Sequence, residues 1–203
     1  MSTYQAASGA VSLDDPIVLK LYAWNARVSG EFMAPLHLCE VVIRNAVCEG
    51  IEAVYGPMWP WSVGFEQSLP YPPKGYNPRR DLQQARQGMN TAGKVIPELK
   101  FVFWQKMFTS RYDVRLWNTY LRQIFPNADQ QKTIGQIRTD IYSELETIRG
   151  LRNRIAHHEP IIARQLDVDF DKIHALIEIR CTRSAAWMLE TTGRVRTTIK
   201  NRP

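Results

Sequence analysis

The segment between residues 134 and 155 constrains the fold most, because its apolar side chains recur at intervals of three or four residues. This period places them on one face of an α-helix. The apolar positions are Ile134, Ile137, Ile141, Leu145, Ile148, Leu151 and Ile155. Pro160 disfavours helical backbone at the residue before it, so this helix should end close to His157 and His158. No stretch shows a convincing strand pattern, and the sequence therefore predicts an all-α fold in which the helices form a bundle.

Other parts of the chain show helical patterns separated by proline and glycine. We expect helices over residues 16–29, 35–55, 79–91, 97–108, 112–125, 132–158 and 170–191. Gly30 should separate the first two, and the proline- and tryptophan-rich residues 56–78 should form an irregular packed loop. Residues 1–13 are small and polar, and we expect them to be frayed. Residues 14–191 would form one domain, followed by a basic tail at residues 192–203 that is either disordered or in contact with an RNA backbone.

The composition is that of an ordinary globular protein with a preference for anionic partners. The 203 residues are 44% apolar and carry a formal net charge of +6. Cys39, Cys48 and Cys181 lack the spacing of metal ligands, and they fit buried small side chains in a reducing compartment. Neither a signal peptide nor an apolar run of about 18 residues is found, so we expect a cytoplasmic protein with no membrane partner.

Residues 151–161, with the sequence LRNRIAHHEPI, join arginine to histidine at the expected helix end. Histidine gives or takes a proton near neutral pH, and the arginine fork fits a phosphate group, so the pair suggests chemistry on a phosphodiester. Asn153 and His157 are four residues apart and share a helix face, whereas Arg152 lies about 140° around the helix from His157. Arg152 and His157 converge only if the last turn is distorted, or they act on one substrate from different sides.

The string Arg152-Asn153-x-x-x-His157 resembles the R-x4-6-H motif of the HEPN superfamily. The longer sequence LRNRIAHHEPI is similar to that of the Abi-like branch of this superfamily, the abortive-infection proteins of bacteria. Residues 36–51 resemble the N-terminal helix of the family, and residues 103–127 resemble its middle region. The resemblance thus covers most of the chain.

The resemblance implies a HEPN-like helical bundle and a metal-independent endoribonuclease that needs no cofactor. The 2′-hydroxyl group of RNA is itself the nucleophile in such an enzyme. His157 would act as the general acid or base, Arg152 would stabilise the phosphate, and Asn153 would orient either group. His158 would be either a second acid–base group or a structural neighbour. Arg154, which shares a helix face with His158, would bind a flanking phosphate.

Further contacts and partners follow from the charges and from the resemblance. Glu40 and Arg44, four residues apart, would either form a surface salt bridge or orient the catalytic residues. Weaker RNA contacts are expected from Arg149, Arg194, Arg196 and Lys200. The expected partners are RNA and a second copy of the chain, since two motifs would form one composite site in a homodimer. The family's role in phage defence or as a toxin implies an antitoxin or a regulatory RNA as another partner.

Three other interpretations remain open. A non-catalytic RNA-binding or assembly module would keep the bundle and its basic surface. A metal site at His157, His158 and Glu159 is disfavoured, because adjacent histidines on a helix point about 100° apart and no HExxH spacing is present. In the third interpretation, the histidines and Glu159 only hold the end of the helix.

Overall fold

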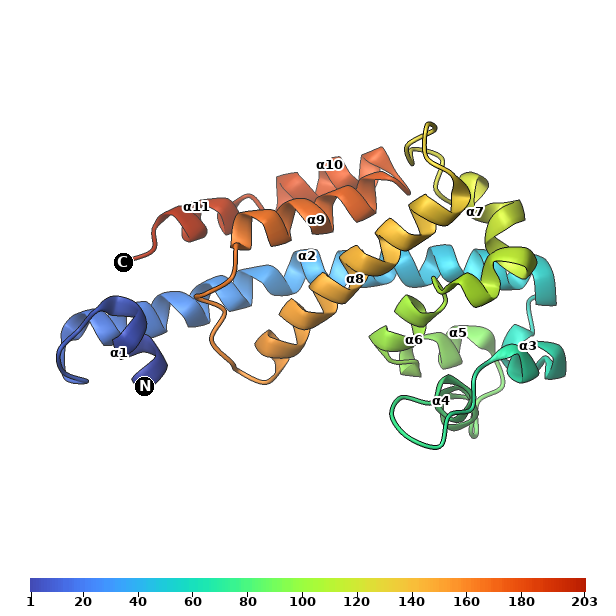
Figure 1. The fold of residues 1–203 in the computed structure, drawn as a ribbon, viewed down its shortest axis with the longest axis horizontal. Coiled ribbons are helices and arrows are strands. Elements are labelled where there is room, and N and C mark those ends of the chain that lie inside the picture. The colour runs from blue at the N-terminus through green and yellow to red at the C-terminus, as the bar shows by residue number, and fades with distance from the viewer. The chain divides into compact units, whose positions relative to one another are not determined.

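The protein is described by a computed structural model that covers every residue from Met1 to Pro203 and contains no β-strand (Figure 1). The predicted all-α fold is thereby confirmed. The helices are α1 (Ser2–Ser8), α2 (Pro16–Tyr55), α3 (Val63–Ser68), α4 (Pro78–Ala85), α5 (Ala92–Val95), α6 (Phe101–Lys106), α7 (Asn118–Ile124), α8 (Ile134–Ala156), α9 (Leu166–Glu178), α10 (Thr182–Thr191) and α11 (Arg194–Lys200). Short 3-10 turns lie at Trp59–Trp61, Ile96–Glu98 and Ser110–Tyr112, and a π-helical turn lies at Asp113–Trp117.

The chain divides into two compact units. The first comprises residues 1–39 and 146–203, and the second comprises residues 40–145. The long helices α2 and α8 contribute residues to both units. Residues 151–161, which carry the predicted catalytic motif, belong to the first unit.

Helix α2 runs through Gly30 and Pro35 without interruption, so the predicted break between these two residues is wrong. The helix begins where expected, and the Asp15 carboxylate accepts a hydrogen bond of 2.9 Å from the N–H of Ile17. Proline inside a helix costs about 3 kcal/mol, because it removes one backbone hydrogen bond and crowds the preceding turn. The helix continues because fully buried apolar side chains recur along its length. They are Val18, Leu21, Val28, Phe32, Cys39, Ile43, Val47 and Ile51.

The N-terminal residues expected to be frayed form helix α1 over Ser2–Ser8. Tyr4 is buried, and its ring meets the ring of Tyr22 on α2 edge-on, with centroids 5.3 Å apart. Aromatic pairs in this arrangement add to the stabilisation that burial alone gives. Tyr4 therefore holds α1 against α2. The prediction of a frayed N-terminus is wrong for residues 2–8.

Most of the basic C-terminal tail forms α11, so the alternative in which this tail is disordered is wrong over these residues. Its contact with RNA stays a prediction. Val195 and Thr198 are buried, and the indole N–H of Trp24 on α2 donates a 2.6 Å hydrogen bond to the Thr198 carbonyl. The single helix predicted over residues 170–191 is divided into α9 and α10, and α10 runs back along α9 (Figure 1). Helix α11 then contacts α9.

The second unit has an aromatic core, to which the proline-rich residues 56–78 contribute. These residues include a 3-10 turn and helix α3, so they are more regular than predicted. The rings of Trp59 and Phe65 from this segment meet edge-on at 5.2 Å, and Phe108 stacks on Trp117 at 4.6 Å. The helices predicted over residues 79–91, 97–108 and 112–125 are present in shorter form as α4, α6 and α7.

Glu66 connects α3 to α4 in this unit. Its carboxylate accepts hydrogen bonds of 2.7 Å from the side-chain amide of Gln83 and 2.5 Å from the guanidinium of Arg86. The hydrogen bond from Gln83, followed by the contact with Arg86, holds the pKa of Glu66 below its ordinary value, although partial burial opposes this shift. These contacts hold α3 against α4.

The three cysteines are free thiols in different surroundings. Cys39 and Cys48 are buried on α2, whereas Cys181 is partly exposed at the start of α10. Burial raises the pKa of the Cys48 thiol to about 12, and hydrogen bonds with Ser184 lower the pKa of the Cys181 thiol. The three thiols therefore differ in solvent exposure, and the pKa of Cys48 and that of Cys181 are shifted in opposite directions.

Candidate functional site at the end of helix α8

Helix α8 ends at Ala156, close to the histidine pair as predicted, and its final turn has a defined geometry. His158 adopts a left-handed backbone conformation with φ of +56°, the only residue other than glycine with a positive φ. Its N–H bonds to the Ile155 carbonyl at 3.1 Å, and the Glu159 N–H bonds to the Arg154 carbonyl at 2.8 Å. This pair of bonds is the Schellman motif, in which glycine usually occupies the left-handed position. A histidine therefore ends this helix at a conformational cost.

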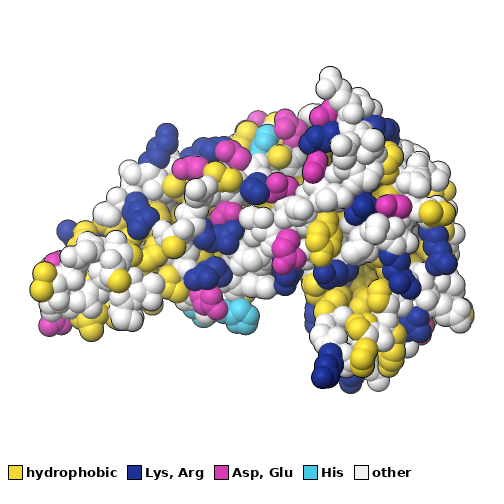
Figure 2. Space-filling view, viewed as in Figure 1, with side chains coloured by type: hydrophobic (Ala, Val, Ile, Leu, Met, Phe, Trp, Pro, Cys, Tyr) yellow, Lys and Arg dark blue, Asp and Glu magenta, His cyan; other side chains and the backbone are white.

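The backbone stays helical as far as His157, because its N–H bonds to the Asn153 carbonyl at 2.9 Å. Asn153 and His157 thus share a helix face, and Arg152 remains about 140° around the helix from His157. The distortion that would bring Arg152 towards His157 occurs one residue too late, at His158. Arg152 and Asn153 are half-buried, whereas both histidines are exposed. Figure 2 shows histidine, basic and acidic side chains gathered at this end of α8.

Arg154 is bound to the backbone that follows the helix. Its Nε atom donates a 3.0 Å hydrogen bond to the Pro160 carbonyl, and Nη1 lies 3.7 Å from a carboxylate oxygen of Glu159. These contacts hold Glu159 and Pro160 against the last turn of α8. Arg154 therefore has a structural part in addition to any contact with a phosphate.

The other arginines expected to contact RNA differ in their surroundings. Arg149 forms an ion pair with Glu146 one turn earlier on α8. Arg196 binds Asp171 at 2.5 Å, and its guanidinium lies 4.8 Å from the centroid of the Phe170 ring. Arg194 and Lys200 are exposed on α11. Two of these four cations are thus already engaged by acidic side chains.

Glu40 and Arg44 lie one turn apart on α2 in the second unit, and both side chains are half-buried. The Nε atom of Arg44 is buried without a hydrogen-bond partner. Their part in orienting the catalytic residues stays a prediction.

Asn25 on α2, which the sequence did not single out, positions the segment after the motif. Its side-chain oxygen accepts a 2.8 Å hydrogen bond from the N–H of Ile161, and the residue is 6% exposed. The pKa of the Tyr4 hydroxyl is raised by burial and by neighbouring Tyr22, and a hydrogen bond with the Asn25 side chain opposes this shift. Asn25 therefore connects α1, α2 and the chain that leaves α8.

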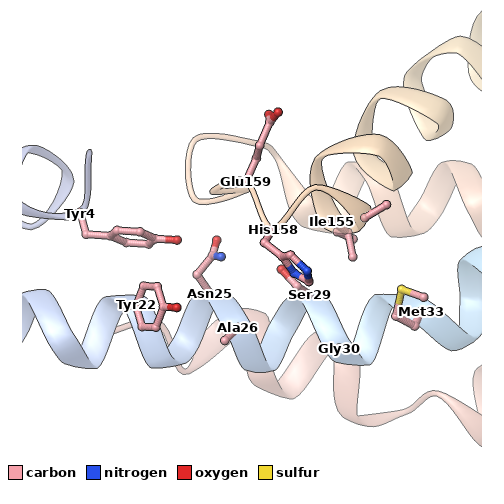
Figure 3. A pocket seen from close by; sticks show the side chains of 11 residues that line it. Tyr4, Tyr22, Asn25, Ala26, Ser29, Gly30, Met33, Ile155, His158 and Glu159 are labelled. Atoms are coloured by element: carbon pink, nitrogen blue, oxygen red, sulfur yellow. The ribbon is translucent and has the colours of Figure 1, made fainter. Parts of the chain in front are cut away.

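Beside the motif lies a cavity of about 510 Å³, formed by α1, α2 and the end of α8 (Figure 3). His158 lines it and points towards Ser29 on α2, whereas the Glu159 side chain points away (Figure 3). Tyr4 and Tyr22 form its other end. The cavity lining includes neither Arg152 nor His157. From residues 151–161 it includes Ile155, Ala156, His158 and Glu159, and of the proposed catalytic or RNA-contacting residues only His158 lines it.

Sequence reasoning missed this cavity, although one signal for it was present. Tyr22, Ala26, Ser29 and Met33 recur at intervals of three or four on α2 and line the cavity together. Their spacing marks a helix face separate from the buried one, which begins with Val18 and Leu21. The contribution of Tyr4 had no such signal, because it depends on how α1 folds back.

The side chains present give no sign of a metal centre, since no three histidine, cysteine, aspartate or glutamate residues are placed to hold an ion together. None of the helices combines the length and the apolar character that a membrane span requires. Comparison of the chain with protein-family models, with curated proteins and with solved structures gives no match. Its function is therefore inferred from the residues and contacts of the site.

Proposed function

We propose that this protein is a metal-independent endoribonuclease of the HEPN type. The observation that carries the proposal is the end of α8, where two exposed imidazoles follow half-buried Arg152 and Asn153. Imidazole transfers protons near neutral pH, and guanidinium binds phosphate. A helix end that carries imidazole and guanidinium groups suits proton transfer at a phosphodiester.

The proposed reaction uses the 2′-hydroxyl group of RNA as the nucleophile. A base takes its proton while the 2′ oxygen forms a bond to phosphorus. The bond from phosphorus to the 5′ oxygen breaks, and an acid gives that oxygen a proton. The products are a 2′,3′-cyclic phosphate and a 5′-hydroxyl end. His157 acts as the acid or base, Arg152 stabilises the charge on the phosphate oxygens, and Asn153 orients one of these groups.

The geometry of one chain favours a site completed by a second copy. Arg152 and His157 diverge by about 140° around α8, so a phosphate beside His157 lies away from the direction in which Arg152 leaves the helix. In a homodimer, His157 of one chain and Arg152 of the other can face one phosphate. The two histidines of such a composite site supply one acid and one base. Cleavage of cellular or phage RNA would fit a toxin or a defence protein, with an antitoxin or a regulatory RNA as its control.

A non-catalytic RNA-binding or assembly module is the second candidate. The contacts of Arg154 and the ion pair of Arg149 favour its assembly form, because both arginines serve the protein's own structure and not an RNA phosphate. A strained His158 that only ended the helix would fit this candidate as well. The two candidates differ in whether RNA is cut.

The deciding experiment compares the parental protein with Arg152→Ala and His157→Ala on end-labelled RNA in EDTA. We expect the parental protein to cut RNA and leave cyclic-phosphate ends, identified by mass spectrometry. Each variant should lose at least about 100-fold in rate, the lower range of what a positioned acid–base group contributes. His37→Ala is the matched control, since His37 is an exposed histidine on α2 outside residues 151–161, and it should keep full activity.

Binding of RNA without cleavage by the parental protein and both variants would favour the binding module. Equal cleavage by the parental protein and His157→Ala would remove His157 from the mechanism. Circular dichroism of each variant separates a loss of chemistry from a loss of fold.

A further inference from the structure

The cavity beside the motif has walls of two kinds. Tyr4 and Tyr22 give it an aromatic end, and their rings meet edge-on at 5.3 Å. Tyr22 is 50% exposed, which leaves part of its ring open to a ligand. The volume of about 510 Å³ lies within the range of about 300–1,000 Å³ that is usual for small-molecule sites. The cavity therefore has room for a planar ring beside an aromatic side chain.

The polar groups of the cavity can recognise the edge of such a ring. The Ser29 hydroxyl and the His158 imidazole enter it from opposite walls (Figure 3). Neither side chain donates or accepts a hydrogen bond within the protein. Asn25 lies between them and the tyrosines, but its oxygen is already used by Ile161. Ser29 and His158 can thus both donate to and accept from a ligand in this cavity.

The charges around the cavity indicate which part of a nucleotide it suits. No lysine or arginine lines it, and its one ionisable acid is Glu159. A phosphate group inside would meet no lysine or arginine and would lose part of its hydration. An uncharged heterocycle meets neither difficulty. His158, the residue with the left-handed backbone, lines the cavity, whereas the exposed His157 does not.

We propose that this cavity binds a single unpaired nucleobase of RNA, stacked against Tyr22 and read at its edge by Ser29 and His158. The inference rests on the proposed ribonuclease, because it places the base next to the phosphodiester on which His157 acts. Unpaired RNA bases commonly stack on aromatic side chains and present their edges to polar groups. The base held in this cavity would select the nucleotide at the cleavage position.

The test uses the full chain and the four ribonucleosides, which have no phosphate and cannot bind through charge. Each is titrated to millimolar concentration while the backbone amides of Ser29 and Gly30 are followed by NMR. At least one nucleoside should shift these amides in a saturable way. Tyr22→Leu should weaken that binding about tenfold, because it removes the stacking surface, and Tyr22→Phe should retain it. Tyr71→Leu is the matched control, since Tyr71 is an exposed tyrosine in the second unit and should have no effect.

No shift with any nucleoside, or a shift that Tyr22→Leu leaves unchanged, would overturn the proposal. The outcome is independent of the cleavage assay. RNA cleavage without nucleoside binding at the cavity would support the proposed ribonuclease activity and rule out the proposed base-binding site. Nucleoside binding without RNA cleavage would support the proposed base-binding site and rule out the proposed ribonuclease activity.

Discussion

The N–H of Glu159 bonds to the carbonyl of Arg154, five residues earlier, at 2.8 Å, and this bond requires the residue between His157 and Glu159 to be left-handed. That residue is His158, whose φ is +56°. A residue with a Cβ atom pays about 1 kcal/mol or more for this conformation. The imidazole therefore occupies a position where glycine would be more stable, and such strain often lies at functional sites.

The first prediction follows from this strain. His158→Gly should raise the stability of the protein by about 1 kcal/mol, or the melting temperature by about 2–4 °C for a chain of this size. His158→Ala, which also lacks the imidazole but keeps the Cβ atom, should give no such gain. Thermal unfolding by circular dichroism measures both. Equal stability of the two variants would show that the backbone of His158 carries no strain.

The second prediction concerns the hydrogen bond between Asn25 and Ile161. Asn25→Ala leaves the buried N–H of Ile161 without a partner, which should cost about 1–3 kcal/mol in urea unfolding. Asn45→Ala removes an exposed asparagine from the same helix and should cost little. Asn25→Asp keeps an acceptor oxygen at the same place and should recover part of the loss. A neutral Asn25→Ala would mean that the segment after α8 does not depend on this bond.

The third prediction concerns the contribution of Arg196 on α11 to stability. Arg196 binds Asp171 and lies over the ring of Phe170, so Arg196→Ala should destabilise the protein by about 0.5–1 kcal/mol. Arg194→Ala removes an exposed neighbour and should leave stability unchanged. Denaturation at low and high salt provides the measurement, because screening should reduce the part of the effect that comes from the ion pair. An Arg196→Ala protein as stable as its parent would contradict the structural role.

The fourth prediction is a pH dependence from Glu66. Its pKa is lower in the folded protein than in the unfolded chain, so the contribution to stability is fully present above the ordinary carboxyl pKa of 4.5. That contribution should be lost as the pH falls from 4.5 through the lower folded value. Glu66→Gln should be less stable than its parent at neutral pH, and the difference should shrink on acidification. Melting temperatures across the acidic range measure it.

Gln83→Ala serves as the control for this effect. It removes the hydrogen bond that contributes most to the shift and should weaken the same pH dependence while leaving the carboxylate in place. An unchanged profile in Gln83→Ala would assign the shift to Arg86 instead.

The sequence predicted the end of α8 well, because the signal there is local. Proline at position 160 and the regular spacing up to Ile155 together limit where the helix can stop. The left-handed conformation of His158 was not predictable in the same way, since no glycine marks it. Only the bonds to Arg154 and Ile155 show how the chain leaves the helix.

Predictions from local sequence were wrong at positions where tertiary packing determines the backbone conformation. Gly30 and Pro35 predicted a break in α2, but the buried stripe on this helix outweighs both propensities. The basic composition of the last twelve residues predicted either disorder or contact with RNA. Val195 nevertheless packs inside, and Trp24 bonds to the backbone of Thr198, far away in the sequence. Contacts between residues so far apart cannot be predicted from a short stretch of sequence.

The surroundings of the three thiols have a practical consequence for the experiments above. Cys39 and Cys48 are buried, and the raised pKa of Cys48 keeps it protonated at neutral pH, whereas Cys181 is partly exposed with a lowered pKa. A maleimide dye should therefore attach to the native protein at one position, the start of α10. The wild-type chain thus carries its own single attachment point for a fluorescent reporter, without any cysteine having to be removed.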